Sequence, residues 1–158
     1  MDKSAVRVLL VEDDPDDHLL TSELLAEIPG RPIVLDWARD FESGLAAVRR
    51  CEHDAVLLDY RLGKGDGLVL LREALKGGCK APVILLTGQG DRDLALLALE
   101  AGAADYLVKS EMNAVVLERA IRYALEKSRH ARDLELTVAA RTAELEKAIQ
   151  AQGASEEY

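Results

Sequence analysis

Ala55-Val56-Leu57-Leu58-Asp59 is an apolar run that ends in an acid, and a loop containing several glycines follows it. An acidic side chain at the end of a buried strand is costly unless its charge has a use. Three more apolar runs end in polar residues: Glu12 and Asp13 after one, Thr87 after another and Lys109 after a third. Carboxylates, a hydroxyl and an ammonium at four strand ends predict one assembled site.

Strand-like and helix-like patterns alternate five times along the chain. The strand-like runs cover residues 6–11, 33–37, 55–58, 82–86 and 104–108. Apolar residues at helical spacing follow each run, over residues 15–28, 41–48, 68–75 and 94–101 and from 113 onward. Continuous apolar runs indicate strands buried on both faces, as in a parallel sheet. The alternation therefore predicts an α/β fold with a five-stranded parallel sheet, in the flavodoxin-like, doubly wound (βα)5 arrangement.

Length and charge narrow the class of protein. The chain has 158 residues, which suits one domain and an appendage. Its formal net charge of −9 argues against sequence-independent binding to nucleic acid, which needs a basic surface. No signal peptide or bilayer-spanning apolar stretch stands out, so we expect a cytoplasmic protein that does not contact membranes. Cys51 and Cys79 lack metal or redox spacing, and we expect both to be free thiols in a reducing compartment.

The C-terminal part of the chain has a long helical pattern that no proline or glycine interrupts between Asn113 and Gly153. Its first part can pack on the sheet, so we place a domain at 4–127, a helical coiled-coil extension or linker at 128–152 and a disordered tail at 153–158. The sparse apolar residues of the extension are Ala131, Leu134, Val138, Leu145 and Ile149. Their spacing indicates a narrow coiled-coil seam in which Arg141 or Thr142 must fill one position. A lone helix this polar is marginal in water, so we expect a homodimer through it.

Carboxylates clustered at strand ends have three physical uses. They bind a hard divalent cation through oxygen ligands, run acid–base chemistry with split pKa values, or accept a phosphoryl group on one nucleophilic carboxylate. The first and third uses reinforce each other, because a cation neutralises charge on both the nucleophile and the phosphate. A nearby lysine adds a second counter-charge, and a hydroxyl can donate to a phosphoryl oxygen.

Four stretches together resemble the response-regulator receiver domain of two-component signalling. They are LLVEDD at 9–14, LLD at 57–59, LLTG at 85–88 and ADYLVK at 104–109. The motifs occur in the family's order, each at the end of a predicted strand, and the resemblance covers residues 4 to 127.

The resemblance implies an acceptor and a metal site. Asp59 would accept the phosphoryl group, with Mg²⁺ (or Mn²⁺) as the cofactor. Asp13 would be a direct metal ligand, and Glu12 would act through water. The backbone carbonyl of Arg61 would complete the protein ligands. The donor would be a histidine kinase, a phosphotransfer protein or a small phosphodonor.

The resemblance also implies a switch. Thr87 would move toward the phosphoryl group, Lys109 would pair with it, and the rotamer of Tyr106 would follow Thr87. Gly67 matches the family's glycine in the loop after the acceptor. The conformational change would be transmitted through the face formed by the fourth helix, the fifth strand and the last helix. We expect no enzymatic activity beyond Mg²⁺-dependent phosphoryl acceptance and autodephosphorylation.

Two departures from the family pattern stand out. Ser110 replaces the family's proline after Lys109, and a cis bond before a residue other than proline costs about 3–4 kcal/mol. We therefore predict a trans Lys109–Ser110 peptide and a reshaped loop. Gly63 replaces a common proline in the loop after Asp59, which predicts a more mobile loop.

Two other classes of protein remain as alternatives. A phosphatase with an aspartyl-phosphate intermediate usually needs a second acid two residues after its nucleophile, where this chain has Arg61. An unphosphorylated coiled-coil scaffold would not need the complete set of polar strand ends. Residues 134–148 resemble helical linkers that join sensory modules to histidine kinases or nucleotide cyclases. We therefore expect either a fragment with a downstream kinase or cyclase domain, or a stand-alone receiver that dimerises.

Other polar residues have simpler interpretations. Acids near helix starts are interpreted as caps and helix-dipole partners, not as ligands: Asp14, Asp16, Asp17, Asp66, Asp91 and Asp93. The three histidines, His18, His53 and His130, show no paired spacing and are predicted to lie at the surface.

Overall fold

Five parallel strands form the central sheet. The computed structural model describes residues 5–63, 65–78, 80–88 and 92–156, so the predictions for Cys79, Asp91 and residues 157–158 fall outside the described residues. The elements are β1 (Val6–Val11), α1 (Pro15–Ala26), β2 (Ile33–Ala38), α2 (Phe41–Arg49), β3 (Ala55–Asp59), β4 (Arg61–Leu62), β5 (Gly65–Asp66), α3 (Gly67–Lys76), β6 (Val83–Thr87), α4 (Arg92–Glu100), β7 (Asp105–Val108), the 3-10 helix η1 (Lys109–Glu111) and α5 (Ala114–Glu156). The chain divides into two compact units after Leu125.

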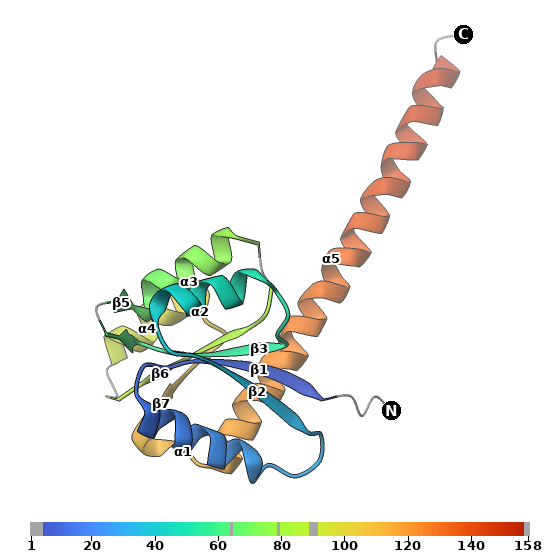
Figure 1. Cartoon of the computed structure of the whole chain (residues 1–158). Helices are drawn as coiled ribbons and strands as arrows, with labels where there is room; N and C mark the ends of the chain where they lie inside the picture. Colours follow the sequence, from blue (N-terminus) through green and yellow to red (C-terminus); the bar gives the residue numbers. More distant parts are fainter. Residues whose placement is uncertain (1–4, 64, 79, 89–91, 157–158) are drawn as a thin grey trace. The chain divides into compact units, whose positions relative to one another are not determined.

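The order of the strands in the sheet is β2-β1-β3-β6-β7, and every neighbouring pair is parallel (Figure 1). This confirms the predicted α/β fold and its doubly wound arrangement. After β2 the chain returns past β1 to form β3, so the strand order reverses between the neighbouring strands β1 and β3. Ligands of such sheets bind beyond the carboxyl ends of the strands at this point. The registers Val11↔Leu58 and Asp59↔Leu86 align the ends of β1, β3 and β6.

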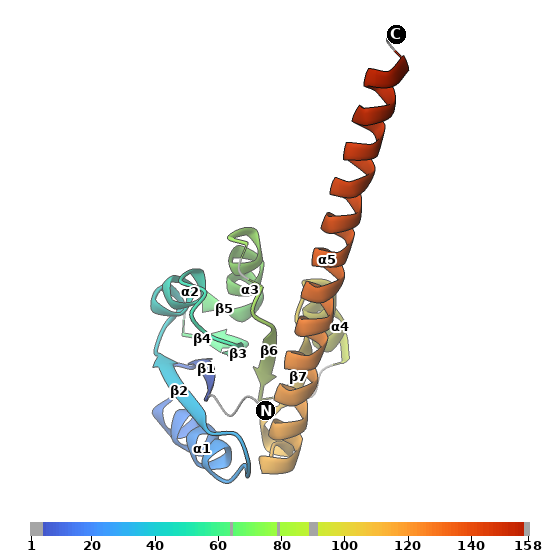
Figure 2. The ribbon, with the colours of Figure 1, turned by 90° about the vertical axis from the view of Figure 1, so that its right-hand side faces the viewer.

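The sheet is covered on both faces, and each face has its own apolar core. Side chains of β1, β3 and β6 alternate between the two cores, as the strand period of two requires. One core includes Val48 of α2, Leu70 of α3 and Ala98 of α4. The other includes Leu25 of α1 and Leu117 of α5. Figure 2 shows α1 and α2 on opposite sides of the sheet. This arrangement explains why the central strands are apolar throughout.

Acidic caps start three of the helices, and two of these caps, Asp14 and Asp66, were predicted. Asp14 caps α1 by accepting a hydrogen bond from the amide of Asp16 at 2.9 Å, and proline follows it in the first turn. Asp40 caps α2 in a capping box, in which Ser43 bonds back to the cap. Asp66 caps α3 as Asp14 caps α1, by accepting a hydrogen bond from the amide of the second residue of the helix at 2.7 Å.

The segments around the predicted site contain two features that the sequence pattern did not predict. The loop after β3 carries a short antiparallel ribbon, in which β4 pairs with β5. A turn of 3-10 helix, η1, follows β7 where the predicted reshaped loop begins. Every peptide bond among the described residues is trans, so the predicted trans Lys109–Ser110 bond is confirmed.

Two histidines are less exposed than predicted. The prediction of a surface position is wrong for His53, which is buried with its Nε2 2.7 Å from Oδ2 of Asp36. This hydrogen bond lowers the pKa of the Asp36 carboxyl. His18 is half-buried because its ring stacks on Trp37, with 3.8 Å between the ring centroids. His130 is exposed, as predicted.

The second unit consists of the part of α5 beyond Leu125. The helix continues to Glu156, so residues 153–156 are helical and not the predicted start of a disordered tail. A single glycine costs a helix only about 1 kcal/mol relative to alanine, so Gly153 does not have to end it. Among the described residues, the helices lack any stretch with the length and apolar content needed to cross a membrane.

Candidate functional site

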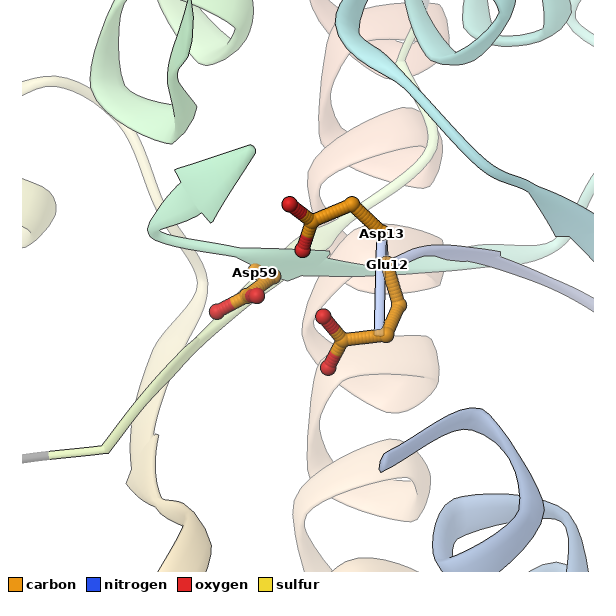
Figure 3. A group of neighbouring side chains, drawn as sticks. All are labelled: Glu12, Asp13 and Asp59. Atoms are coloured by element: carbon orange, nitrogen blue, oxygen red, sulfur yellow. The ribbon is translucent and has the colours of Figure 1, made fainter. Parts of the chain in front are cut away.

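Three carboxylates meet at the carboxyl ends of neighbouring strands. Glu12 and Asp13 directly follow β1, and Asp59 is the last residue of β3. One oxygen from each carboxylate lies within 4.8 Å of the others, and Figure 3 shows the side chains of Glu12 and Asp13 turned towards Asp59. Glu12 is 1% exposed and Asp59 is 5% exposed, whereas Asp13 faces solvent. Buried carboxylates this close need a counter-charge or a proton.

Lys109 supplies a counter-charge from the end of β7. Its Nζ donates to Oε1 of Glu12 at 2.7 Å and to Oδ2 of Asp17 at 2.8 Å. The same nitrogen lies 3.2 Å from Oδ2 of Asp59. Burial alone would lower the pKa of Lys109, but the hydrogen bonds to Asp17 and Glu12 outweigh it and raise the pKa above its usual range. Lys109 is therefore a fixed ammonium that reaches across the sheet to β1 and β3.

Burial and the neighbouring Asp59 favour the protonated form of Glu12. Burial, followed by the hydrogen bond that it shares with Asp59, raises the pKa of Glu12 to about 8, although Lys109 acts in the opposite direction. The main cause is that burial removes the Glu12 carboxylate from water, and the negative charge of Asp59 adds to the effect. A cation of higher charge would stabilise the ionised form of the cluster.

The donor set fits such a cation. Carboxylate oxygens are the ligands that hard divalent cations prefer, and a Mg²⁺ ion binds oxygen at about 2.0–2.1 Å. Two ligands of one Mg²⁺ ion therefore lie at most about 4.2 Å apart. The observed spread of 4.8 Å is close to this limit. One of the three carboxylates acting through a water molecule would accommodate the difference.

The cluster opens into a cavity of about 740 Å³. Its lining includes Thr87 at the end of β6, Arg61 of β4 and Lys109, so most predicted site residues meet at one place. Thr87 is buried. Tyr106 is not part of this lining. It is half-buried on β7, opposite Leu85 in the register, and packs against the core beneath α2, α3 and α4.

A glycine allows the backbone to close tightly behind Asp59. A Cβ atom on Gly67 would lie 2.4 Å from the carbonyl oxygen of Asp59 and 2.9 Å from Cα of Tyr60. The amide of Gly67 donates to the carbonyl of Tyr60 at 2.7 Å. The start of α3 therefore touches the backbone that carries the Asp59 side chain.

Residues 8–122 match the family described as the response regulator receiver domain. The chain belongs to this family. The receiver is 36% identical over 104 residues to the transcriptional regulatory protein QseB of Haemophilus influenzae, which covers 66% of this chain and 46% of that protein. It is 35% identical over 130 residues to the transcriptional regulatory protein AruR of Pseudomonas aeruginosa, covering 79% of this chain and 51% of that protein.

Solved receiver structures show the same fold. A receiver domain protein from Clostridium thermocellum superposes with a TM-score of 0.67 at 32% identity, covering 80% of this chain and 98% of that one. A CheY-like receiver domain protein from Methanospirillum hungatei superposes with a TM-score of 0.71 at 26% identity, covering 81% of this chain and 99% of that one. Several relatives in sequence are named as transcriptional regulators or activators, and the chain spans about half of their length. The expectation that the whole protein does not bind nucleic acid therefore has no support from these relatives.

Sequence reasoning missed one contact of the receiver's site. Asp17 lies in the first turn of α1, where its interpretation as a helix-dipole partner is sound, but its carboxylate also bonds Lys109. The available signal was its position four residues after Asp13, one helical turn into the element that follows the acidic pair. A contact between residues 92 positions apart leaves no trace in local periodicity.

Proposed function

We propose that this receiver is a phosphorylation-dependent switch of a two-component phosphorelay, with Asp59 as its phospho-acceptor. The observation that carries the proposal is the meeting of Asp59 with Glu12, Asp13 and Lys109 at the end of the sheet. A buried carboxylate beside two further acids and an ammonium has the counter-charges that phosphoryl transfer needs.

The chemical step uses Asp59 as a nucleophile. One carboxylate oxygen attacks the phosphorus atom of the donor, and the bond from phosphorus to the donor's histidine nitrogen breaks. The nitrogen keeps the electron pair and takes up a proton, and Asp59 becomes an acyl phosphate. Glu12, Asp13, Asp59 and the backbone carbonyl of Arg61 would hold Mg²⁺. The cation would supply positive charge to the phosphoryl oxygens.

The new charge would rearrange the residues around it. A phosphoryl group carries about −1.5 to −2 charge at neutral pH and offers several acceptor oxygens. The hydroxyl of Thr87, which lines the same cavity, would donate to one of them, and Lys109 would pair with another. Tyr106 would then turn inward on β7. Such an event works by shifting the balance between two pre-existing conformations of α4, β7 and the start of α5.

The second unit would carry the output as a homodimer. Four apolar side chains of the predicted seam are 56–68% exposed within the single chain: Leu134, Val138, Leu145 and Ile149. A second copy of the same helix would cover this stripe in a parallel coiled coil. Phosphorylation would change the pairing or register of the two helices. A histidine kinase or phosphotransfer protein would be the input partner, and a kinase or cyclase domain a downstream one.

The two alternative functions are less well supported. A phosphatase-type enzyme needs a second acid two residues after the nucleophile, and the residue there, Arg61, is an exposed cation. A scaffold without phosphorylation does not account for two buried carboxylates that share one ammonium.

The proposal is tested by labelling with a small phosphodonor, such as acetyl phosphate, in the presence of Mg²⁺. The expected result is one acid-stable, base-labile phosphoryl group per chain. This group should not form when the metal is chelated or in Asp59→Asn. Asp54→Asn is the matched control, because Asp54 is an exposed acid at the opposite end of β3. Equal labelling of Asp59→Asn and the unchanged chain would refute the assignment.

A further inference from the structure

Asp17 brings a further carboxylate to the site, where it contacts Lys109. Its Oδ2 lies 2.8 Å from Nζ of Lys109, nearly as close as the 2.7 Å contact from Glu12. The contact of the same nitrogen with Asp59 is longer, at 3.2 Å. The Asp17 side chain is 35% exposed and belongs to the lining of the cavity.

These distances show how the ammonium is shared. An ammonium has three N–H donors, and here two of them make short hydrogen bonds to Glu12 and Asp17. Asp59 has the weakest hold on Lys109, although it is the proposed acceptor. The first turn of α1 therefore shares Lys109 with Glu12 and Asp59.

A phosphoryl group on Asp59 would change this balance. Its oxygens would extend from Asp59 into the cavity that Asp17 and Lys109 both line. Lys109 would be drawn towards the new charge, whereas the carboxylate of Asp17 would repel it.

We infer that Asp17 is a positioning residue that competes with the phosphoryl group for Lys109 and so weakens the phosphorylated state of the receiver. The inference rests on the proposed function of Asp59. Asp17 does not touch the reacting atoms and acts through the ammonium. Without Asp17, one of the two short ion pairs that compete with the phosphoryl group for Lys109 is absent, and only the pair with Glu12 remains.

The neighbouring residue separates this role from a purely structural one. Asp16 and Asp17 are both acids in the first turn of α1, so both interact favourably with the helix dipole. Asp16 is exposed and does not belong to the cavity lining. Asp16→Asn and Asp17→Asn thus remove the same charge from the same turn, and only the second removes the contact with Lys109.

The test is the affinity of the full chain for beryllofluoride, a phosphoryl analogue, at saturating Mg²⁺. Trp37 is the single tryptophan of the chain, and its Nε1 donates to the backbone carbonyl of Glu12 at 2.7 Å, so its fluorescence can report binding. A partly exposed ion pair is typically worth a factor of up to about five in an equilibrium constant. We expect Asp17→Asn to bind beryllofluoride about two- to fivefold more tightly, Asp16→Asn to stay within about 1.5-fold, and Asp17→Glu to return towards the unchanged chain.

A second measurement follows Lys109 itself. The ammonium protons of Lys109 should be protected from exchange in the unchanged chain without beryllofluoride. Asp17→Asn should reduce this protection, because only the short bond to Glu12 remains, while Asp16→Asn should keep it. Unchanged or weaker binding of beryllofluoride by Asp17→Asn, or equal tightening by Asp16→Asn, would overturn the inference. If the unchanged chain itself shows no Mg²⁺-dependent response to beryllofluoride, the proposed function fails as well. If it responds and Asp17→Asn does not bind more tightly, only the role of Asp17 is wrong.

Discussion

Replacing Gly67 with alanine tests how tightly the backbone closes behind Asp59. The added methyl group would lie 2.4 Å from the carbonyl oxygen of Asp59, and an ordinary contact needs at least 3.4 Å. Both atoms that it meets first, in Asp59 and Tyr60, belong to the backbone, so no side-chain rotation relieves the clash. The start of α3 must therefore move away from the end of β3 by about 1 Å.

Three contributions decide the size of the effect. Overpacking of this kind costs about 1–3 kcal/mol. The same movement stretches the 2.7 Å hydrogen bond from the amide of Gly67 to the carbonyl of Tyr60, at a cost of about 0.5–1.5 kcal/mol. Alanine gains at most about 1 kcal/mol over glycine in a helix, and less in its first turn. The clash and the lost bond outweigh this gain, so we expect a net destabilisation of about 1–3 kcal/mol.

Equilibrium unfolding in urea measures this difference, since a change in midpoint at constant slope reports stability alone. Gly88→Ala is the matched control, because among the described residues no atom beyond its chain neighbours lies within 4 Å of the added methyl group. We expect its stability to change by less than about 0.5 kcal/mol. A Gly67→Ala protein as stable as Gly88→Ala would refute the close approach of α3 to β3. The shift should also reduce labelling at Asp59, whose backbone it displaces.

Two further predictions concern the second unit and the charge of the site. Leu145→Glu places a charge in the proposed seam and should yield monomers by light scattering. Leu136→Glu, at a more exposed position outside the seam, should leave the dimer intact. Dimers of both variants would exclude this seam. Burial and the bond to Asp59 raise the pKa of Glu12 from 4.5 to about 8, so the metal-free folded chain binds more protons than the unfolded chain between these values. Its midpoint of thermal unfolding should therefore fall as the pH rises from about 5 to about 8, and Mg²⁺ should reverse much of the loss; a midpoint that rises over this window without metal would contradict the assignment.

Most of the fold was predictable because its determinants are local or periodic. Apolar runs such as Val6–Val11 are long enough to identify strands buried on both faces, and acids such as Asp14 and Asp66 mark helix starts by their side-chain chemistry. The β4–β5 ribbon was missed because two-residue strands carry no period. The helix was predicted to end at Gly153, but it continues, because one glycine lowers helix stability without preventing the helix.

The site was predictable to the extent that parallel strands bring their carboxyl ends together. This rule places Glu12, Asp13 and Asp59 side by side from the order of the strands alone. It does not predict which of several possible partners a long side chain contacts. The bond from Lys109 to Asp17 depends on the path of η1 and on the angle of α1, and neither leaves a pattern in the sequence. The burial of His53 has a similar cause, since its partner Asp36 lies on a different strand.

The central claim is that Asp59 carries the phosphoryl group, and the most direct test is chemical trapping of that residue. Borohydride reduces an acyl phosphate on aspartate to homoserine, which remains at the labelled position and is read by peptide mass spectrometry. After incubation with acetyl phosphate and Mg²⁺, we expect homoserine at position 59 and at no other acid. Homoserine at Asp13 or Asp17, or none anywhere in a chain that retains its fold, would contradict the account.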